Sequence, residues 1–375
     1  MIIAHWNESC KDDIKLIEYS DDKILLKDLE KKENIRFLLC KKCCKKEIEN
    51  IKNKFITAEY NDNIKISDNI TVKFINAGHI PGSASVIFTV GNQKVLFSGD
   101  LGSGYSRFNG IFDIPEKVDL IFMEATYADD KNQLSMSQYE LFRKDLQSAA
   151  ASGKTIWIPA LSCNRTQKIL YELKLMQDNG KLSREMPIYS VSTSANAVTS
   201  LYQNEVKKRK TNYQGAISNS WFLEDVYQKG SILPENVKLQ RIRNYDAQMI
   251  LISSSGDMDK GISAMLLPKM LTRKNVFIMI VNYVNLYSNV GLLLQNKRTH
   301  SSIKSLAKIK KYDIFSDHID FYSLPKWLLN QDKNVEIYII HLSDKNMQNA
   351  IKFLKDKGWR RVNGTKIRKS IRYAS

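Results

Sequence analysis

Five ionisable residues follow apolar segments of this sequence, at positions where the chain would leave a strand. His79 lies in INAGHIPGS, Asp100 closes LFSGD and Glu124 lies in IFMEATY, while His318 lies in DIFSDHID and His341 follows IYII. Loops at strand ends carry side chains into clefts, so such residues often share a site. The chain has only five histidines, and three of them stand in these segments. Any one of the five residues alone would more often be structural, but the set predicts a metal site or an acid–base site.

A second group of residues has the surroundings of phosphate ligands. Arg165 stands in a turn just before a helical segment, and Ser253, Ser254, Ser255 and Gly256 form a turn after MILI. Small residues at such turns let backbone N–H groups approach phosphate oxygens. Because Ser-Gly turns are also common between elements, the sequence leaves a purely structural turn open.

The overall charge favours a polyanionic partner. The chain carries 57 Lys and Arg against 40 Asp and Glu, which gives a formal net charge of +17. A field of this sign attracts RNA or DNA, although a biased composition with a solvated basic surface would give the same excess. No apolar run approaches the roughly 20 residues of a membrane span, and the five cysteines lack the spacing of a disulfide framework. We therefore expect a cytoplasmic protein, or a nuclear one in a eukaryote, with reduced thiols and no membrane partner.

The elements that must position these residues fall into two groups. The first group is rich in β-structure: a hairpin is expected over 14–26, followed by strands over 35–39, 70–77, 85–90, 94–99 and 119–124. From residue 135 to about residue 283, strands alternate with longer helical segments, which is typical of an α/β domain with a parallel sheet. Helices are expected over 137–153, 165–180, 195–209 and 261–271, and strands over 155–161, 186–192, 249–255 and 275–281.

The α/β group is embedded in the β-rich group, because β-rich segments return after it. From about residue 301, the segment KIKKYDIFS, a helix around FYSLPKWLLN and a strand in VEIYIIH are expected to complete the first sheet. The basic last residues are expected to form an edge strand or a tail. No linker rich in Pro, Gly or Ser separates the two groups. We therefore predict a first domain made of residues 1–126 and 301–375, with a second domain, residues 127–300, inserted into it.

In their order and wording, these segments resemble the β-CASP branch of the metallo-β-lactamase superfamily. That branch includes ribonuclease J and the endonuclease of the cleavage and polyadenylation specificity factor. The resemblance extends to IPALSCNRTQKILYEL, similar to the family's strand-turn-helix after its acidic motif, and to SSSGDM, similar to its Ser-Ser-Gly-Met turn. It covers nearly the whole chain. The resemblance implies an α/β fold in which an αββα metallo-β-lactamase sandwich carries an inserted β-CASP domain with a parallel sheet.

The resemblance also implies a role for each of the five ionisable residues. His79 and His341 match ligands of one zinc ion each, and Asp100 matches the carboxylate that bridges the two ions. Glu124 matches the β-CASP acidic residue, and His318 matches the histidine that acts as general acid toward the leaving group. Asp100, Glu124 and His318 are thus expected to be catalytic. Two zinc ions bridged by a carboxylate can deprotonate water at neutral pH and clamp a phosphodiester, and a histidine at the position of His341 resembles the RNA-acting members more than the DNA-acting ones.

The family's main ligand motif, His-x-His-x-Asp-His, is missing from this sequence. Where it would align, after IRFLL, its four ligand positions are occupied by Lys41, Cys43, Lys45 and Lys46. A protonated ammonium group has no lone pair for zinc, and several of them repel divalent cations, so we expect at most one zinc ion, or none. Cys43 could join a single-zinc site, and the short spacing to the His79 segment leaves open that this region is remodelled. Lys45 and Lys46 could contact phosphate instead, or lie on a solvated basic helix.

Two functions fit this combination best. The first is a pseudo-nuclease that binds RNA and pairs with an active β-CASP paralogue or with a second copy of itself, which explains why the fold motifs remain without the ligand motif. The second is an active zinc-dependent endo- or exoribonuclease that works with one metal ion or borrows a ligand such as His5, which explains why all five ionisable residues remain. A small-molecule hydrolase is disfavoured by the inserted domain, which covers the cleft in relatives that act on nucleic acids.

Overall fold

The computed structural model describes residues 54–103, 111–127, 136–208, 248–295, 298–315, 318–342 and 344–364. The chain divides into two compact units, Met1–Glu59 and Tyr60–Ser375, and the second unit contains all of the helices and strands that the structure describes. The hairpin predicted over 14–26, the strand over 35–39 and the Lys41–Lys46 segment lie outside the described residues.

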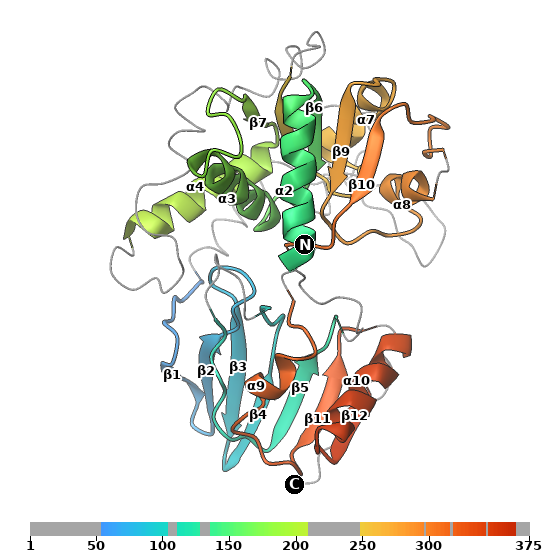
Figure 1. Ribbon diagram of the computed structural model, residues 1–375. Coiled ribbons are helices and arrows are strands. Elements are labelled where there is room, and N and C mark those ends of the chain that lie inside the picture. The colour runs from blue at the N-terminus through green and yellow to red at the C-terminus, as the bar shows by residue number, and fades with distance from the viewer. Residues whose placement is uncertain are drawn as a thin grey trace, which may run out of the picture. The chain divides into compact units, whose positions relative to one another are not determined.

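Seven strands form the first sheet, in the order β1-β2-β3-β4-β5-β11-β12 (Figure 1). Their bounds are β1 Asn63–Ser67, β2 Ile70–Asn76, β3 Ala84–Val90, β4 Gln93–Phe97, β5 Leu120–Glu124, β11 Glu336–Ile340 and β12 Arg361–Gly364. Neighbours from β1 to β4 are antiparallel, whereas β4, β5, β11 and β12 run parallel to one another. As a result, β2, β4, β5 and β11 all end at the same edge of the sheet.

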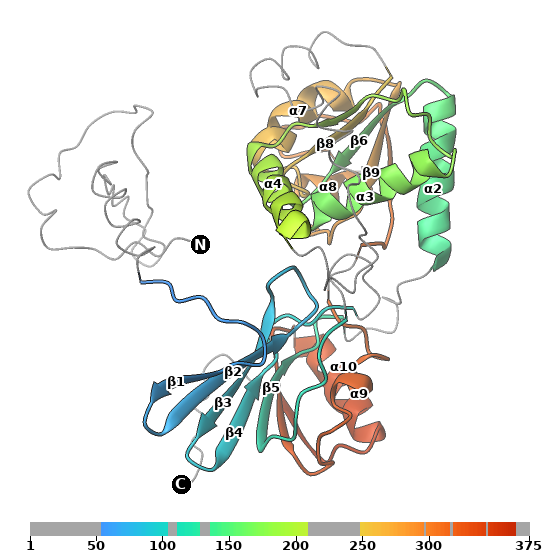
Figure 2. The same cartoon turned by 90° about the vertical axis from the view of Figure 1, so that its left-hand side faces the viewer.

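Two helices cover one face of this sheet (Figure 2). They are α9, Leu324–Trp327, and α10, Asp344–Asp356. Successive side chains of a strand point to opposite faces, and Ile87, Leu96 and Ile121 share a buried core with the two helices. The core residues of α10 recur at the spacing of one helix face, as Met347, Ala350 and Leu354.

Five parallel strands form the second sheet, in the order β10-β9-β6-β8-β7. Their bounds are β6 Thr155–Pro159, β7 Ile188–Ser190, β8 Ile250–Ser253, β9 Val276–Ile280 and β10 Lys308–Lys311. The residues of β6, β8 and β9 are buried along the whole of each strand. Continuous burial of this kind is expected of a parallel sheet that is covered on both faces.

Helices supply that cover on both sides of the second sheet (Figure 1). On one side lie α2, Met136–Ala151, and α3, Arg165–Asp178, with α4, Thr193–Lys208, beside α3. On the other side lie α7, Gly261–Leu271, and α8, Asn289–Leu294. No helix among the described residues is long and apolar enough to cross a membrane.

The structure confirms the predicted α/β fold, including the alternation of helices and strands in the second sheet. One expectation is wrong: the KIKK segment does not complete the first sheet, because β10 pairs in parallel with β9 at the edge of the second sheet. The physical reason is that Ile309 packs against the core beside β9, while Lys308 lies over the ring of Phe277. The domain bounds 1–126, 127–300 and 301–375 otherwise stay a prediction.

Candidate active site

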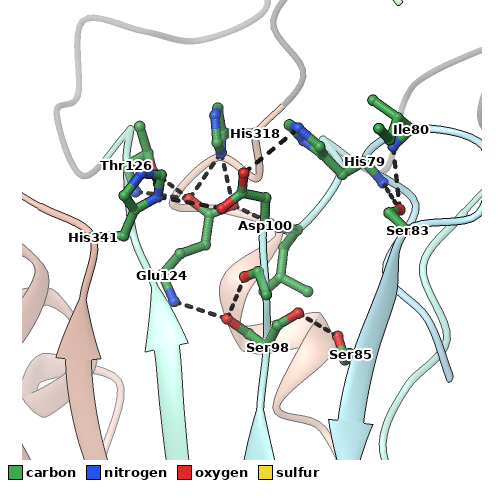
Figure 3. Close-up of polar contacts among 12 residues, drawn as sticks. His79, Ile80, Ser83, Ser85, Ser98, Asp100, Glu124, Thr126, His318 and His341 are labelled. Carbon is green, nitrogen blue, oxygen red and sulfur yellow. Dashed lines mark hydrogen bonds and ion pairs between the residues drawn. The ribbon is translucent and has the colours of Figure 1, made fainter. Parts of the chain in front are cut away.

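The carboxyl ends of four strands, together with the loop before α9, bring the five ionisable residues together (Figure 3). His79 comes from the loop after β2, Asp100 from the loop after β4, Glu124 from the last position of β5 and His341 from the position after β11. His318 comes from the loop before α9. Because these four strand ends share one edge of the sheet, residues far apart in the sequence meet there.

Glu124 is the most enclosed residue of this cluster, with 1% of its surface exposed. Nδ1 of His318 lies 2.8 Å from Oε1 of Glu124 and 3.0 Å from Oε2. Oε1 also accepts the backbone N–H of Leu101 at 2.6 Å, and Oε2 accepts the backbone N–H and the hydroxyl group of Thr126. Burial raises the pKa of Glu124, but the hydrogen bond and charge of His318, with the other donors, outweigh it and hold this pKa below its ordinary value of 4.5. Glu124 is therefore an ionised acceptor that orients His318.

Asp100 lies between two histidines. Nε2 of His79 is 3.8 Å from Oδ2 of Asp100, and Nδ1 of His341 is 3.3 Å from Oδ1. The side chains of Asp100 and His341 are more exposed than those of His79 and His318, so they form the open side of the cluster. His341 has a φ of 59°, in the left-handed region that non-glycine residues seldom adopt. Such strain persists only where the surrounding structure imposes it.

Close contacts between loops fix the side chains of this cluster. The loop of Asp100 approaches the loop of His79 so closely that a Cβ added at Gly102 would overlap the carbonyl oxygen of Gly78. The hydroxyl group of Ser83 accepts the backbone N–H of His79 at 3.0 Å. Because Gly102 has no Cβ, the two loops can pack closely, and His79 and Asp100 can face each other.

Three residues of the site with hydroxyl side chains were not predicted from the sequence. The hydroxyl group of Ser98 accepts the N–H of Glu124 at 2.9 Å, and Ser83 holds the loop after β2. Thr126 contacts Glu124, and its Oγ1 lies 3.5 Å from Nδ1 of His341. The only signal in the sequence is that each stands within four residues of an ionisable residue, which is too common a pattern to single them out.

His79, Asp100 and His318 are suited to hold a metal ion. One ligand atom from each lies within 4.8 Å of the others. Ligand atoms around a tetrahedral zinc ion stand about 3.4 Å apart, so the 3.8 Å between His79 and Asp100 would need a small closure, and any pair of the set nearer to 4.8 Å a larger one. Two imidazoles and a carboxylate are also donor types that zinc accepts. The sequence predicts His341 rather than His318 as a ligand, and that assignment stays a prediction.

The predicted phosphate turn lies at the carboxyl edge of the second sheet, after β8. Oγ of Ser254 is 2.5 Å from Oγ of Ser192, which follows β7. Ser255 donates its hydroxyl to the carbonyl of Lys260 at 3.2 Å. Gly256 packs so closely on the loop after β9 that a Cβ would overlap its Asn282. The turn is well built, and its contact with phosphate stays a prediction.

Arg165 is buried rather than presented to a ligand. Its Nη1 donates to the carbonyl of Val281 at 2.5 Å and to that of Ile314 at 3.1 Å. The guanidinium group therefore joins the end of β9 to the segment that leads to His318. Phosphate contact by this side chain stays a prediction that its burial does not favour, and Lys45 and Lys46 lie outside the described residues.

Asn164 connects the second sheet to the site. Its Nδ2 donates to the carbonyl of His79 at 3.4 Å, and its Oδ1 accepts the hydroxyl of Tyr202 at 3.1 Å. The turn after β6 therefore supports the same loop that carries His79.

Comparison with known proteins agrees with this architecture. The Beta-Casp domain model matches residues 166–287, and the described part of this range contains β7, β8 and β9 of the second sheet. An RNase J-like protein of Methanocaldococcus jannaschii is 32% identical over 165 residues, which are 43% of this chain and 38% of that relative. A ribonuclease of Thermus thermophilus is 30% identical over 138 residues, 37% of this chain and 31% of that relative.

A more distant match extends over most of the chain. Integrator complex subunit 11 of Danio rerio is 21% identical over 323 residues, which are 83% of this chain and 50% of that relative. The chain thus spans about half of the length of these relatives or less. Together with the two sheets, the Beta-Casp domain match and these relatives support the β-CASP branch of the metallo-β-lactamase superfamily as the family of this chain.

Proposed function

We propose that this protein is an RNA-processing member of its family that binds RNA through a degenerate nuclease site and cleaves it poorly or not at all. The proposal depends on one observation: the site keeps some of the family's functional residues but lacks its main ligand motif. His79, Asp100, Glu124, His318 and His341 lie together at one sheet edge, yet the sequence lacks the motif that supplies the family's other ligands. The relatives named as ribonucleases support RNA as the ligand.

The missing motif argues against two metal ions. Lys41, Lys45 and Lys46 stand at the aligned positions, and a protonated ammonium group cannot donate a lone pair to zinc. Cations at those positions would repel a pair of divalent ions but attract the phosphate oxygens of RNA. We therefore propose a site that holds one zinc ion at most and keeps its affinity for a polyanion.

The residues that remain would each act on a bound phosphodiester in a different way. His79 and Asp100, with His341 as the third ligand where His318 acts as the acid, would hold the one zinc ion, which would supply a Lewis acid for a phosphoryl oxygen. Glu124 keeps His318 in a fixed orientation, from which its imidazolium form could donate a proton to a leaving oxygen. This arrangement serves binding and orientation even where hydrolysis is slow.

An active ribonuclease is the second candidate, and one observation favours it. Glu124 is a buried carboxylate that stays ionised because its donors outweigh the cost of burial, and its hydrogen bonds hold His318 and the loop of Thr126. A protein that only binds RNA has no chemical need for that pair. The active enzyme would work with one metal ion, or with ligands outside the described residues.

The proposed partners follow from this function. RNA is the ligand, and an active β-CASP paralogue or a second copy of this chain is the protein partner. One relative is by name a subunit of a complex, which supports the pairing. The cytoplasm, or the nucleus of a eukaryotic cell, is the compartment where such RNA would be met.

Binding and cleavage of a labelled RNA by the full chain test the proposal. We expect the affinity to fall steeply with added salt, because released counterions drive binding to phosphates, and the RNA to stay intact with zinc present. Cleavage that is lost in Asp100→Asn would establish the active enzyme instead. A wild-type chain that binds no RNA at low salt would refute both candidates.

A further inference from the structure

Three large side chains between β9 and α8 point into solvent. Tyr283 has 80% of its surface exposed, Leu286 64% and Tyr287 82%. Single exposed apolar residues are ordinary on protein surfaces, but contiguous groups mark binding sites. These three stand within five consecutive positions, 283–287, and we call this segment the aromatic loop.

Hydrogen bonds hold the backbone of the aromatic loop in place. Asn282, at its start, is buried and donates from Nδ2 to the carbonyl of Pro159 at 2.7 Å. Oδ1 of Asn285 accepts the N–H of Tyr287 at 3.0 Å, and the hydroxyl of Ser288 donates to the carbonyl of Asn285 at 2.7 Å. The backbone is thus fixed while the large side chains remain outside. That combination is expected of a preformed binding surface, since no ordering is needed when the ligand arrives.

The stretch of chain that contains the aromatic loop is strongly basic. From Lys260 to Tyr312 the sequence has eight lysines, two arginines and no aspartate or glutamate, a net charge of +10 within a chain total of +17. Its elements α7, β9 and α8 share one core on one side of the second sheet (Figure 1). Within this stretch Lys310 pairs with Asp145 and Lys311 with Asp313, so the free excess is smaller than the sequence count, but it remains positive and favours an anionic ligand.

The aromatic loop and the candidate active site are anchored on the same turn. Oδ1 of Asn282 accepts the N–H of Leu161 at 3.4 Å, and Asn164 in the same turn donates to the carbonyl of His79 at 3.4 Å. The turn after β6 thus connects the base of the loop to the loop of His79.

We propose that Tyr283 and Tyr287 form a stacking platform for the bases of a single-stranded nucleic acid, RNA in the first place. The inference rests on the proposed function, and it specifies that the RNA is bound as a single strand. Aromatic rings stack on the face of any base, while nearby cations attract the phosphates. Bases within a duplex are already stacked on their neighbours, so the platform selects single strands over duplexes.

Binding of one labelled RNA strand, alone and annealed to its complement, tests the platform. We would measure fluorescence anisotropy with the full chain, with a chelator present so that the RNA stays intact. The wild-type protein should prefer the single strand. Tyr283→Ala and Tyr287→Ala should each weaken single-strand binding about 5- to 150-fold, the equivalent of one lost base stack, and leave duplex binding and the salt dependence unchanged. Single-stranded DNA should show the same losses, because stacking does not read the 2′-hydroxyl group.

Two control variants separate stacking from general damage. Tyr287→Phe keeps the ring and should bind as the wild-type protein does. Tyr322→Ala removes another exposed tyrosine, outside the aromatic loop, and should also leave binding unchanged.

The possible failures are distinguishable. A wild-type protein without RNA affinity would refute the proposed function together with the platform. A wild-type protein that binds single strands, with both alanine variants binding equally well, would refute the platform alone. Alanine variants that change the oligomeric state in solution but not the RNA affinity would identify the aromatic loop as a contact between copies, and would overturn the platform as well.

Discussion

The imidazole of His318 lies against the carboxylate of Glu124, with Nδ1 2.8 Å from Oε1 and 3.0 Å from Oε2, although the two residues are 194 positions apart in the sequence. The contact joins the last residue of β5 to the loop before α9. The contact also helps to keep the buried carboxylate of Glu124 ionised, because the hydrogen-bond donors around Glu124 outweigh the cost of burying its charge. The stability of the first sheet and the orientation of His318 therefore depend on the same interaction.

Replacing Glu124 with glutamine should destabilise the protein. An amide in that position loses its charge and directs a donor group at N–H groups that need an acceptor, which costs about 2–3 kcal/mol in the free energy of unfolding. Glu116→Gln is the control, because Glu116 and its partners Lys73 and Lys94 are only partly buried, and it should cost less than about 1 kcal/mol. Urea unfolding would measure both. If both variants lost the same unfolding free energy, the hydrogen bonds of Glu124 would not contribute the stability that we assign to them.

The stabilising effect of Glu124 should depend on pH in one direction. Its pKa is lowered in the folded protein, so its contribution is complete above the ordinary carboxyl pKa of 4.5 and is lost as the pH falls through the lower folded value. The gap in unfolding free energy between the wild-type protein and Glu124→Gln should shrink as the pH falls below about pH 5. A gap that widens below pH 5 would mean that the folded pKa is raised instead.

Gly102→Ala should disturb the site without touching an ionisable residue. A Cβ at Gly102 would overlap the carbonyl oxygen of Gly78, so the loops of Asp100 and His79 would have to separate. We expect a loss of about 2–3 kcal/mol in stability, as for overpacked sites, and weaker binding of zinc. Gly91→Ala is the control: nothing lies within 4 Å of the added Cβ, although Gly91, unlike Gly102, has a positive φ that alanine adopts only with strain. It should cost about 1 kcal/mol and leave zinc binding intact.

Much of the fold follows from local sequence patterns. Short β-rich segments such as 85–90 and 119–124 are strands at the predicted places, and continuous apolar runs such as 275–281 mark the buried parallel strands. The KIKK segment was assigned to the wrong sheet, because its pattern of lysine and isoleucine suits an edge strand of either sheet. Helix α10 was not predicted. Its apolar residues have helical spacing, but the apolar strand β11 just before it is the stronger pattern in that region.

The site was predictable only in part, and the reason is physical. Strand ends place ionisable residues at a sheet edge, which a single sequence can indicate. Which side chains then meet depends on contacts between distant loops, such as the one that brings His318 close to His79 and Asp100. Burial depends on the same contacts, and this is why Arg165 has the sequence surroundings of a phosphate ligand but donates to backbone carbonyls.

The zinc content of the purified full chain tests the central claim most directly. Elemental analysis after dialysis against excess zinc should find no more than one ion per chain, because the described donors suit a single ion and ammonium groups stand in the sequence where the other ligands would be. If one ion is found, His79→Ala should remove it, whereas His300→Ala, which changes a histidine outside the cluster, should not. Two zinc ions per chain, both lost on substitution of Asp100, would contradict the account.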